Sequence, residues 1–309
     1  MKISVIIATL NRAADLRKAL ESILSQTEPP FEVLVIDQSV DEETCLLAEE
    51  LKESALSKKI YLRYIRQSEK SLVKARNRGI LLAAGEIISF LDDDIVLFSD
   101  YFAHINQAFE ADSKLAGVSG NVIVRSKLEG TKWRLRKALM EFFLLSNFDG
   151  KMTVSGFGTP IYERVIDRTL QVEFLPGCDM NFRKDRMGDE TFDEWFTGYS
   201  FREDAEFSYR MSQLGKCIMI PQAKLYHNYS VSNRLNVDAL TRMTIQNYHY
   251  VYLKHKNRHF YSKFFFGYSI LGLVLMDLIE FLSRRDPERF SKVRAEVATS
   301  IELMMGGVK

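Results

Sequence analysis

The sequence predicts an α/β fold: a Rossmann-like, mostly parallel twisted sheet with helices on both faces, followed by a helical C-terminal extension. Short apolar runs rich in β-branched residues recur through the first half of the chain, which is typical of strands covered on both faces. Between these runs, apolar residues recur at helical spacing. The connections are short, so strand–helix–strand units with right-handed crossovers are expected.

The predicted strands and helices alternate along the first part of the chain. Strands are predicted over residues 3–8, 31–36, 60–65, 87–91 and 116–124, and helices over residues 16–24, 42–53 and 74–84. Pro29 and Pro30 end the first helix, and Gly85 ends the third. In the second half, residues 126–170 contain a basic, aromatic helical segment at 132–148 and are otherwise not assigned. Helices are expected again at 238–254 and 264–282.

Composition narrows the possible partners. The 309-residue chain has a net charge of +1, so no overall field recruits nucleic acid and no such partner is expected. Three sparse cysteines without metal-binding spacing favour a reducing compartment, here the cytoplasm, over a disulfide framework. Asn11, Arg12 and Asp15 interrupt the apolar N-terminal run, which favours a buried strand there over an export signal.

Polar side chains follow three of the expected strands at the point where each strand ends. Thr9 and Asn11 follow the first strand, residues 37–41 follow the second, and residues 92–94 follow the fourth. Ligands bind at the carboxyl ends of strands in open α/β sheets, so we expect a binding site at this edge. Ordinary polar loops would explain one such cluster more readily than three.

The three consecutive aspartates at 92–94 are the strongest of these signals. Adjacent carboxylates repel one another unless a cation or hydrogen-bond donors compensate them. Carboxylates one residue apart on a loop commonly hold Mg²⁺ or Mn²⁺ together with phosphate oxygens. The alternative is a helix N-terminus, where aspartate is also favoured.

Each of the other candidate residues also has both a functional and a structural interpretation. Asp37 can accept a hydrogen bond from a base or ribose, or its neighbours can cap a helix. Arg76 lies in a cationic run that also suits a solvated helix face. Asp204 beside Glu203 can act as a general base, and both acids suit the first turn of a helix. His227 can bind a metal or a pyrophosphate, or it can be structural.

The order of these motifs resembles that of glycosyltransferase family 2. The matching stretches read SVIIATLNR, EVLVIDQS, ARNRGI, ISFLDDD, LPGCDMNFR, TFDEWF, EDAEFSYR and PQAKLYH. The resemblance covers about residues 1–230 and implies a GT-A fold in a single catalytic domain at 1–232. It implies a nucleotide-binding half at about 1–125 and an acceptor half at about 126–232. Residues 233–309 are then the helical C-terminal extension, either membrane-interfacial or oligomerising.

The resemblance also assigns roles to residues. It implies donor nucleotide contacts from Thr9, Asn11, Asp37, Arg76, Asp92 and Asp93. It implies a Mn²⁺ or Mg²⁺ ion bound by Asp94, Asp92 and His227, and it makes Asp204 the catalytic base. The acceptor side is expected to include Gly177, Cys178, Asp179, Trp195 and Glu203.

The activity implied by the resemblance is an inverting, metal-dependent transfer. The donor is a nucleoside-diphosphate sugar, with UDP as the default, and the acceptor is a hydroxyl of a glycan or glycolipid in cell-surface polysaccharide synthesis. One base and no second nucleophilic carboxylate favour a single displacement, hence inversion. The alternatives are a non-catalytic nucleotide-sugar-binding protein and a sugar-1-phosphate nucleotidyltransferase. The latter needs a glycine-rich loop after the first strand, and residues 9–13 contain no glycine.

The apolar run at 264–276 indicates where in the cell the protein works. Asp277 and Glu280 interrupt it, so it falls short of the roughly 20 apolar residues of a spanning helix. Cations flank it on both sides. One interpretation is an interfacial helix in peripheral contact with the inner membrane leaflet, at the cytoplasmic face, which suits a lipid-linked glycan acceptor. The other is packing against the catalytic domain or between subunits.

Overall fold

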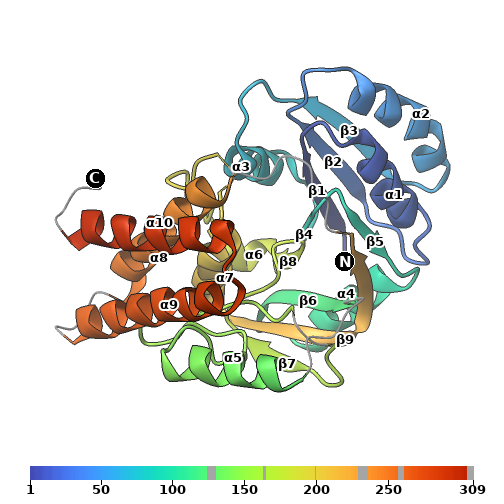
Figure 1. The fold of residues 1–309 in the computed structure, drawn as a ribbon. Coiled ribbons are helices and arrows are strands. Elements are labelled where there is room, and N and C mark those ends of the chain that lie inside the picture. The colour runs from blue at the N-terminus through green and yellow to red at the C-terminus, as the bar shows by residue number, and fades with distance from the viewer. Residues whose placement is uncertain (124–129, 163–164, 199, 229–235, 257–260, 305–309) are drawn as a thin grey trace. The chain divides into compact units, whose positions relative to one another are not determined.

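The computed structural model describes all residues except 124–129, 163–164, 199, 229–235, 257–260 and 305–309 (Figure 1). The chain forms two compact units. We call Met1–Lys127 with Ile161–Val231 the sheet unit, and Leu128–Pro160 with Ser232–Lys309 the helical unit. Residues 128–160 therefore group with the C-terminal helices. The functional boundaries at 125 and 232 remain predictions.

The first half of the sheet unit consists of strand–helix–strand units, as predicted. Its elements are β1 (Ile3–Thr9), α1 (Ala13–Leu24), β2 (Glu32–Asp37), α2 (Glu43–Ser57), β3 (Tyr61–Arg66), α3 (Leu72–Leu82) and β4 (Ile87–Leu91). The four strands pair in parallel in the order β3-β2-β1-β4. Nearly every position of β1, β2 and β4 is buried, which requires cover on both faces. The register pairs Thr9 with Asp37, so these two polar strand ends lie at one edge.

Antiparallel pairing enters the sheet beyond β4. The further elements are β5 (Ile95–Leu97), α4 (Tyr101–Ala111), β6 (Leu115–Ile123), β7 (Leu170–Val172), β8 (Asp179–Arg183), α6 (Lys184–Met187), α7 (Glu203–Leu214) and β9 (Lys216–His227). Within the described residues the order continues β4-β8-β6-β9-β5, with β7 beside β9. β8 runs antiparallel to β4 and β6, and β5 runs antiparallel to β9. Local periodicity does not encode these directions, because distant segments set them.

Close packing holds the helices and strands of the sheet unit together. A Cβ added to Gly79 on α3 would lie 2.4 Å from Cγ2 of Ile6 on β1, so only glycine permits this approach. Phe90 packs edge-on against Phe192 and Phe207, with ring centroids 5.0 and 6.3 Å away. Phe192 and Phe207 stack at 4.2 Å. These contacts join β4 to α7 and to the loop before it.

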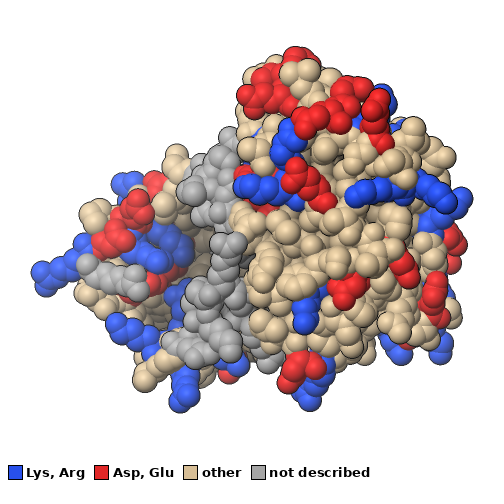
Figure 2. All heavy atoms as spheres, turned by 90° about the vertical axis from the view of Figure 1, so that its right-hand side faces the viewer, with Lys and Arg blue, Asp and Glu red and all other residues tan. Residues whose placement is uncertain are grey.

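The surface of the chain carries charges of both signs. Figure 2 shows acidic and basic side chains interspersed on one face. Acidic side chains gather at the top of that view, the level at which α2 lies in Figure 1. The near-zero net charge of the chain therefore reflects many opposed charges rather than few charges.

The helical unit has its own apolar core. It contains α5 (Thr131–Phe142), α8 (Val237–His255), α9 (Ser262–Arg284) and α10 (Pro287–Met304). Its core comprises Leu145, Phe157, Ile245, Tyr248, Tyr252, Phe266, Ile270 and Met276. The helices predicted at 238–254 and 264–282 are confirmed, whereas the helix expected at 132–148 ends at Phe142. Within α9, the 22-residue stretch Ser262–Ser283 contains an 18-residue window with a mean hydropathy of 1.8, and by length and composition it could cross a membrane.

Candidate active site

The three consecutive aspartates lie in the turn between β4 and β5. Leu91 at the end of β4 pairs with Asp179 of β8, and Ile95 at the start of β5 pairs with His227 of β9. Antiparallel pairing therefore fixes the turn on both sides. This pairing brings the C-terminal end of β9 to the aspartates, although the two segments lie far apart in the sequence.

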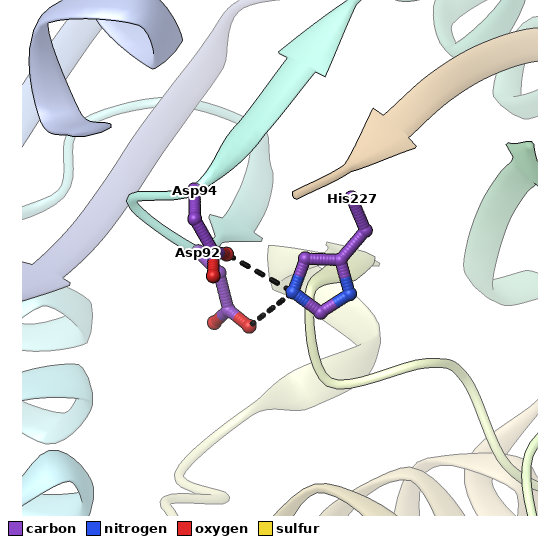
Figure 3. A group of neighbouring side chains, drawn as sticks. All are labelled: Asp92, Asp94 and His227. Atoms are coloured by element: carbon purple, nitrogen blue, oxygen red, sulfur yellow. Dashed lines mark ion pairs between the residues drawn. The ribbon is translucent and has the colours of Figure 1, made fainter. Parts of the chain in front are cut away.

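Asp92, Asp94 and His227 converge at this turn (Figure 3). The Nε2 atom of His227 lies 3.0 Å from Oδ1 of Asp94 and 3.9 Å from Oδ2 of Asp92. One ligand atom of each residue lies within 4.8 Å of the others. Two carboxylate oxygens and an imidazole nitrogen suit Mn²⁺, and the carboxylates also suit Mg²⁺. The donor set therefore fits the divalent cation that the sequence predicts.

Arg12 supplies positive charge to the same turn from the loop after β1. Its Nη1 lies 2.7 Å from Oδ1 of Asp93, and its Nη2 lies 2.6 Å from Oδ2 of Asp94. Thr9 donates a hydrogen bond from Oγ1 to Oδ2 of Asp93 at 2.7 Å. The carboxylate of Asp93 is thus bound by β1 and its loop, whereas about a third of the Asp92 side chain is exposed. The two outer aspartates remain the candidate ligands.

The pKa values of the turn reflect burial and these contacts. Burial raises the pKa of Asp93 to about 7, although Arg12 and Thr9 act against it. Burial also acts to raise the pKa of Asp94, but the hydrogen bonds and charges of His227 and Arg12 outweigh burial and lower that pKa to about 2. Burial lowers the pKa of His227, but the hydrogen bond to Asp94 and the charge of Asp92 produce a net rise. In its protonated form, His227 is therefore a counter-charge for Asp94.

Arg76 joins the aspartate turn to the second half of the sheet unit. It lies on the buried face of α3, whose first turn is capped by Ser71 through a hydrogen bond from the backbone N–H of Lys74. Its guanidinium donates to Oε1 of Glu203 at 2.9 Å and to the carbonyl of Gly177 at 3.1 Å. It also lies 3.4 Å from Oδ1 of Asp92. Arg76, which the sequence predicts to contact the donor, therefore already interacts with three groups of the protein.

Glu203 and Asp204 open the first turn of α7, beside the loop before β8. The helix starts after Arg202, which has a left-handed backbone with φ of 78°. A Cβ added to Gly177 would lie 2.6 Å from Oδ2 of Asp204, so that carboxylate rests on the glycine. Burial and the charge of Asp204 raise the pKa of Glu203 to about 8, and these effects outweigh Arg76. Near neutral pH, Glu203 therefore holds a proton.

Asp37 is buried at the end of β2 and bound on both carboxylate oxygens. Its Oδ1 accepts the backbone N–H of Ser39 at 2.9 Å. Its Oδ2 accepts the hydroxyl of Tyr64 at 2.8 Å and a guanidinium N–H of Arg66 at 3.0 Å. Asn11 lies nearby, because its backbone N–H donates to the hydroxyl of Ser39 at 2.7 Å. The loops after β1 and β2 are thus joined to each other.

The predicted acceptor residues lie in different environments. Cys178 is buried in the apolar core, and its carbonyl accepts the backbone N–H of Asp92 at 3.4 Å. Asp179 is fully buried, and its carboxylate accepts hydrogen bonds inside the fold from Tyr101, Asn181, Ser119 and Gly120. Trp195 is 37% exposed and meets Phe196 edge-on. Of these, Trp195 presents a side chain to solvent and Asp179 does not.

The structure brings most of the predicted site residues together and adds two that sequence reasoning missed. Contacts connect the residues Thr9, Arg76, Asp92, Asp93, Asp94, Gly177, Glu203, Asp204 and His227. Arg12 was missed as a site residue, although it is the cation nearest to the end of the first strand. Tyr162 was missed because it lies in the unassigned segment; its hydroxyl accepts the backbone N–H of Gly177 at 2.9 Å.

Comparisons with known sequences point to one family. The model of the family described as glycosyl transferase family 2 matches residues 4–171. A GalNAc(5)-diNAcBac-PP-undecaprenol β-1,3-glucosyltransferase of Campylobacter jejuni is 30% identical over 158 residues, which cover 48% of this chain and 50% of that protein. Matches to other curated relatives cover as little as 13% of the relative. The chain thus spans at most about half the length of these relatives.

Solved structures with similar folds cover nearly the whole chain. The mannosyltransferase PcManGT of Pyrobaculum calidifontis, in complex with GDP-Man and Mn²⁺, has a TM-score of 0.60 at 15% identity, covering 99% of this chain and 88% of that one. TarS 1-349 of S. aureus, in complex with UDP-GlcNAc, has a TM-score of 0.57 at 13% identity, covering 99% and 92%. These likenesses confirm the predicted fold class.

Proposed function

This chain belongs to glycosyl transferase family 2, and from that premise we propose that it transfers a sugar from a nucleoside-diphosphate sugar to a hydroxyl group of an acceptor. The observation that carries the proposal is the convergence of Asp92, Asp94 and His227 at the carboxyl edge of the parallel strands. Open α/β sheets bind nucleotides at this edge. UDP is the first nucleotide to test, since TarS binds UDP-GlcNAc in a similar fold, with GDP and dTDP as alternatives.

Mn²⁺ or Mg²⁺ is the proposed cofactor. Asp92, Asp94 and His227 would hold the ion, which when bound neutralises the charge of the nucleoside diphosphate. Arg12 already binds the far side of Asp94 and one oxygen of Asp93. It therefore keeps these two carboxylates in place and disperses their mutual repulsion. PcManGT, with a similar fold, was solved with Mn²⁺.

Asp204 is the proposed catalytic base. Its carboxylate rests on Gly177, beside the loop whose carbonyl is held by Arg76. It would take the proton from the acceptor hydroxyl as that oxygen attacks the anomeric carbon. The neighbouring Glu203 already holds a proton near neutral pH and binds Arg76. Its proposed role is therefore to position the start of α7 and the Gly177 loop, and it does not act as a second base. A single displacement by the acceptor inverts the anomeric centre.

The remaining predicted residues divide between donor and acceptor. Asp37 and Thr9, at the ends of adjacent strands, are proposed to lie beside the nucleotide, with Arg76 acting through the groups that it binds. Trp195 is the proposed platform for an acceptor sugar, because its ring is partly exposed and aromatic faces bind sugars by apolar contact. Gly177 and Cys178 shape the loop between the two sides.

A glycan or lipid-linked glycan is the proposed acceptor, in cell-surface polysaccharide synthesis. The C. jejuni relative is named for an undecaprenol-linked glycan. An acceptor of that kind is presented at a membrane, so we propose that the protein works in the cytoplasm, in peripheral contact with the membrane's cytoplasmic face. The apolar helix α9 supports such contact.

Ligand-dependent melting tests the donor site. We would measure the melting temperature with UDP, GDP, dTDP and CDP, each with Mn²⁺ or with EDTA, because a ligand that binds only the folded state raises stability by about 2.7 kcal/mol at a hundred times its dissociation constant. We expect one nucleotide to raise the temperature in the presence of Mn²⁺. Asp94→Ala should abolish that rise, and Asp100→Ala, an aspartate outside the turn, should not.

Three outcomes would change the conclusion. If no nucleotide shifts the melting temperature with or without metal, the donor site is not where we place it. If a nucleotide binds but the intact protein transfers no sugar to a broad panel of acceptors, the chain is a nucleotide-sugar-binding protein. Transfer of sugar with equal rates in EDTA would remove the metal from the proposal.

A further inference from the structure

Helix α9 exposes a stripe of large apolar side chains. Leu271, Leu275, Ile279 and Leu282 follow one another at intervals of four, four and three residues, and Phe264 lies one heptad before Leu271. Such spacing places them on one face of a helix. Their exposed fractions range from 36% to 69%. Monomeric soluble proteins seldom leave a contiguous apolar face of this kind in water.

The two acidic residues of α9, Asp277 and Glu280, lie on the opposite face and are paired within the helical unit. Asp277 is 1% exposed; its Oδ2 lies 2.6 Å from Nζ of Lys292 on α10, and Oδ1 lies 3.5 Å from Nη1 of Arg289. Glu280 pairs with Arg289 at 3.2 Å and with Arg136 on α5 at 3.3 Å. The helix thus turns its polar face toward its neighbours and its apolar face outward.

This orientation distinguishes a helix that lies on a membrane from one that spans it. A spanning α9 would have to leave α5 and α10, which would leave Asp277, Lys292 and their partners as unpaired charges, an unfavourable state inside a membrane. A helix lying in the interface keeps these pairs and immerses only the stripe. Length and composition alone allow both arrangements, and the ion pairs favour the second.

Helix α5 extends the apolar face of α9. The ring of Phe142, 66% exposed, lies 5.9 Å from that of Tyr268 on α9, and Tyr268 stacks on Phe264 at 6.4 Å. The two helices meet closely at Gly272, where an added Cβ would lie 2.2 Å from Cγ of Phe143. The exposed rings of α5 and α9 therefore form one continuous surface, and the two helices lie side by side in Figure 1.

The charge beside this surface is positive. Lys132 and Arg134 on α5 and Lys263 on α9 are exposed and form no ion pair with any residue that the structure describes. The helical unit as a whole has 17 basic and 10 acidic residues, a net charge of +7, whereas the sheet unit has 25 and 31, a net charge of −6. The apolar face and the basic charge thus belong to the same unit.

We propose that the outward face of α9, together with α5, docks the helical unit on an anionic lipid bilayer, with α9 lying in the headgroup region rather than crossing it. The positive charge of the helical unit favours a bilayer over a second copy of the protein as the partner of this face. A bilayer with anionic headgroups attracts each nearby Lys or Arg, whereas a second copy of this face would bring the same cations against each other. The proposal specifies the membrane contact proposed above and does not depend on the transfer reaction.

Vesicle binding by the full chain tests the proposal. We would sediment the protein with phosphatidylcholine vesicles with and without phosphatidylglycerol, at low and high salt. Lys132→Gln with Arg134→Gln should weaken binding to anionic vesicles by about thirtyfold, at about 1 kcal/mol for each basic residue. Leu271→Glu with Ile279→Glu should weaken it at least about tenfold. Leu46→Glu, at an exposed leucine of α2 in the sheet unit, is the matched control and should bind as the wild type does.

Each variant is also tested for folding and donor binding. All substituted side chains are exposed, so the melting temperature and its shift with nucleotide and Mn²⁺ should be unchanged. Loss of vesicle binding with the nucleotide shift retained separates this proposal from the donor site.

Three results would overturn the proposal. Equal binding to neutral and anionic vesicles would remove the electrostatic part. Resistance of the bound wild type to high salt and carbonate would indicate a spanning helix. A dimer in solution that Leu271→Glu with Ile279→Glu converts to a monomer, without vesicle binding by either, would make the face an interface between copies.

Discussion

The Nε2 atom of His227 lies 3.0 Å from Oδ1 of Asp94, so the end of β9 brings a third ligand atom to the candidate metal site at the turn after β4. The antiparallel pairing of Ile95 with His227 holds this relationship. A proton and a metal ion would both use the lone pair of Nε2, so protonation of His227 and binding of a metal by this atom exclude each other. His227 therefore links three properties: the proposed metal binding, its own protonation and the pairing of β5 with β9 that holds it in place.

Metal binding should weaken as the pH falls. Burial lowers the pKa of His227, but Asp94 and Asp92 raise it overall above its ordinary value of 6.5, so the ion must displace a proton in acid. We expect Mn²⁺ affinity, measured by calorimetry, to drop as the pH is lowered through this range. His227→Gln should bind Mn²⁺ at least about tenfold more weakly and lose most of this pH dependence. An unchanged pH profile in His227→Gln would show that His227 is not a ligand.

Asp204→Asn should lose transfer activity while keeping donor binding. The substitution preserves the size of the side chain over Gly177 but removes the proton acceptor, and general bases contribute about 10²- to 10⁴-fold to rate. We expect a fall in kcat of that size, with an unchanged nucleotide-induced shift in melting temperature. Asp185→Asn, at an aspartate of α6, is the control. Full activity in Asp204→Asn would disprove its role as the base.

Glu203 should make stability depend on pH. Its pKa is raised from 4.5 in the unfolded chain to about 8 in the folded state, so between these values the folded state binds one more proton. The free energy of unfolding contributed by this group therefore falls as the pH rises through that window. Glu203→Gln removes the titration, and its melting temperature should decline less than that of the wild type from acid to pH 8. Parallel curves would mean that Glu203 is ionised throughout.

Two glycines of α9 should respond oppositely to alanine. A Cβ at Gly272 would overlap Phe143, whereas one at Gly267 meets no atom within 4 Å. Overpacking costs about 1–3 kcal/mol, while alanine gains about 1 kcal/mol over glycine inside a helix. Gly272→Ala should therefore lower the melting temperature, and Gly267→Ala should leave it unchanged or raise it. Equal effects of the two substitutions would mean that α5 and α9 do not meet at Gly272.

The sequence predicted the elements of the parallel half almost completely. Runs of β-branched residues and helical periodicity gave β1 to β4 and α1 to α3, with ends that differ from the structure by a few residues. Asp92 and Asp94 could be named as candidate ligands because strand ends and carboxylate spacing are local features. These signals are short in range, and short-range patterns are what a sequence shows directly.

The mixed half of the sheet was not predictable in this way. β5 and β7 are three residues long, too short to show a period, and the antiparallel entry of β8 depends on pairing with β4. Arg12 and Tyr162 were missed for a related reason. Neither lies in a pattern of its own, and each acquires a role only through a group that the fold brings near it: Asp93 and Asp94 for Arg12, and Gly177 for Tyr162.

The sequence by itself determined the fold class, the family resemblance and the residue types that can bind a cation, because these follow from local periodicity and ordered motifs. Only the tertiary structure decided that the carboxylate of Asp179 is used inside the fold, that Arg76 binds Glu203 and Gly177, and that α9 faces outward with its apolar side. The physical reason is that burial and pairing partners are properties of contacts between distant segments. A side chain's chemistry is written in the sequence, but its charge state and its neighbours are set by the fold.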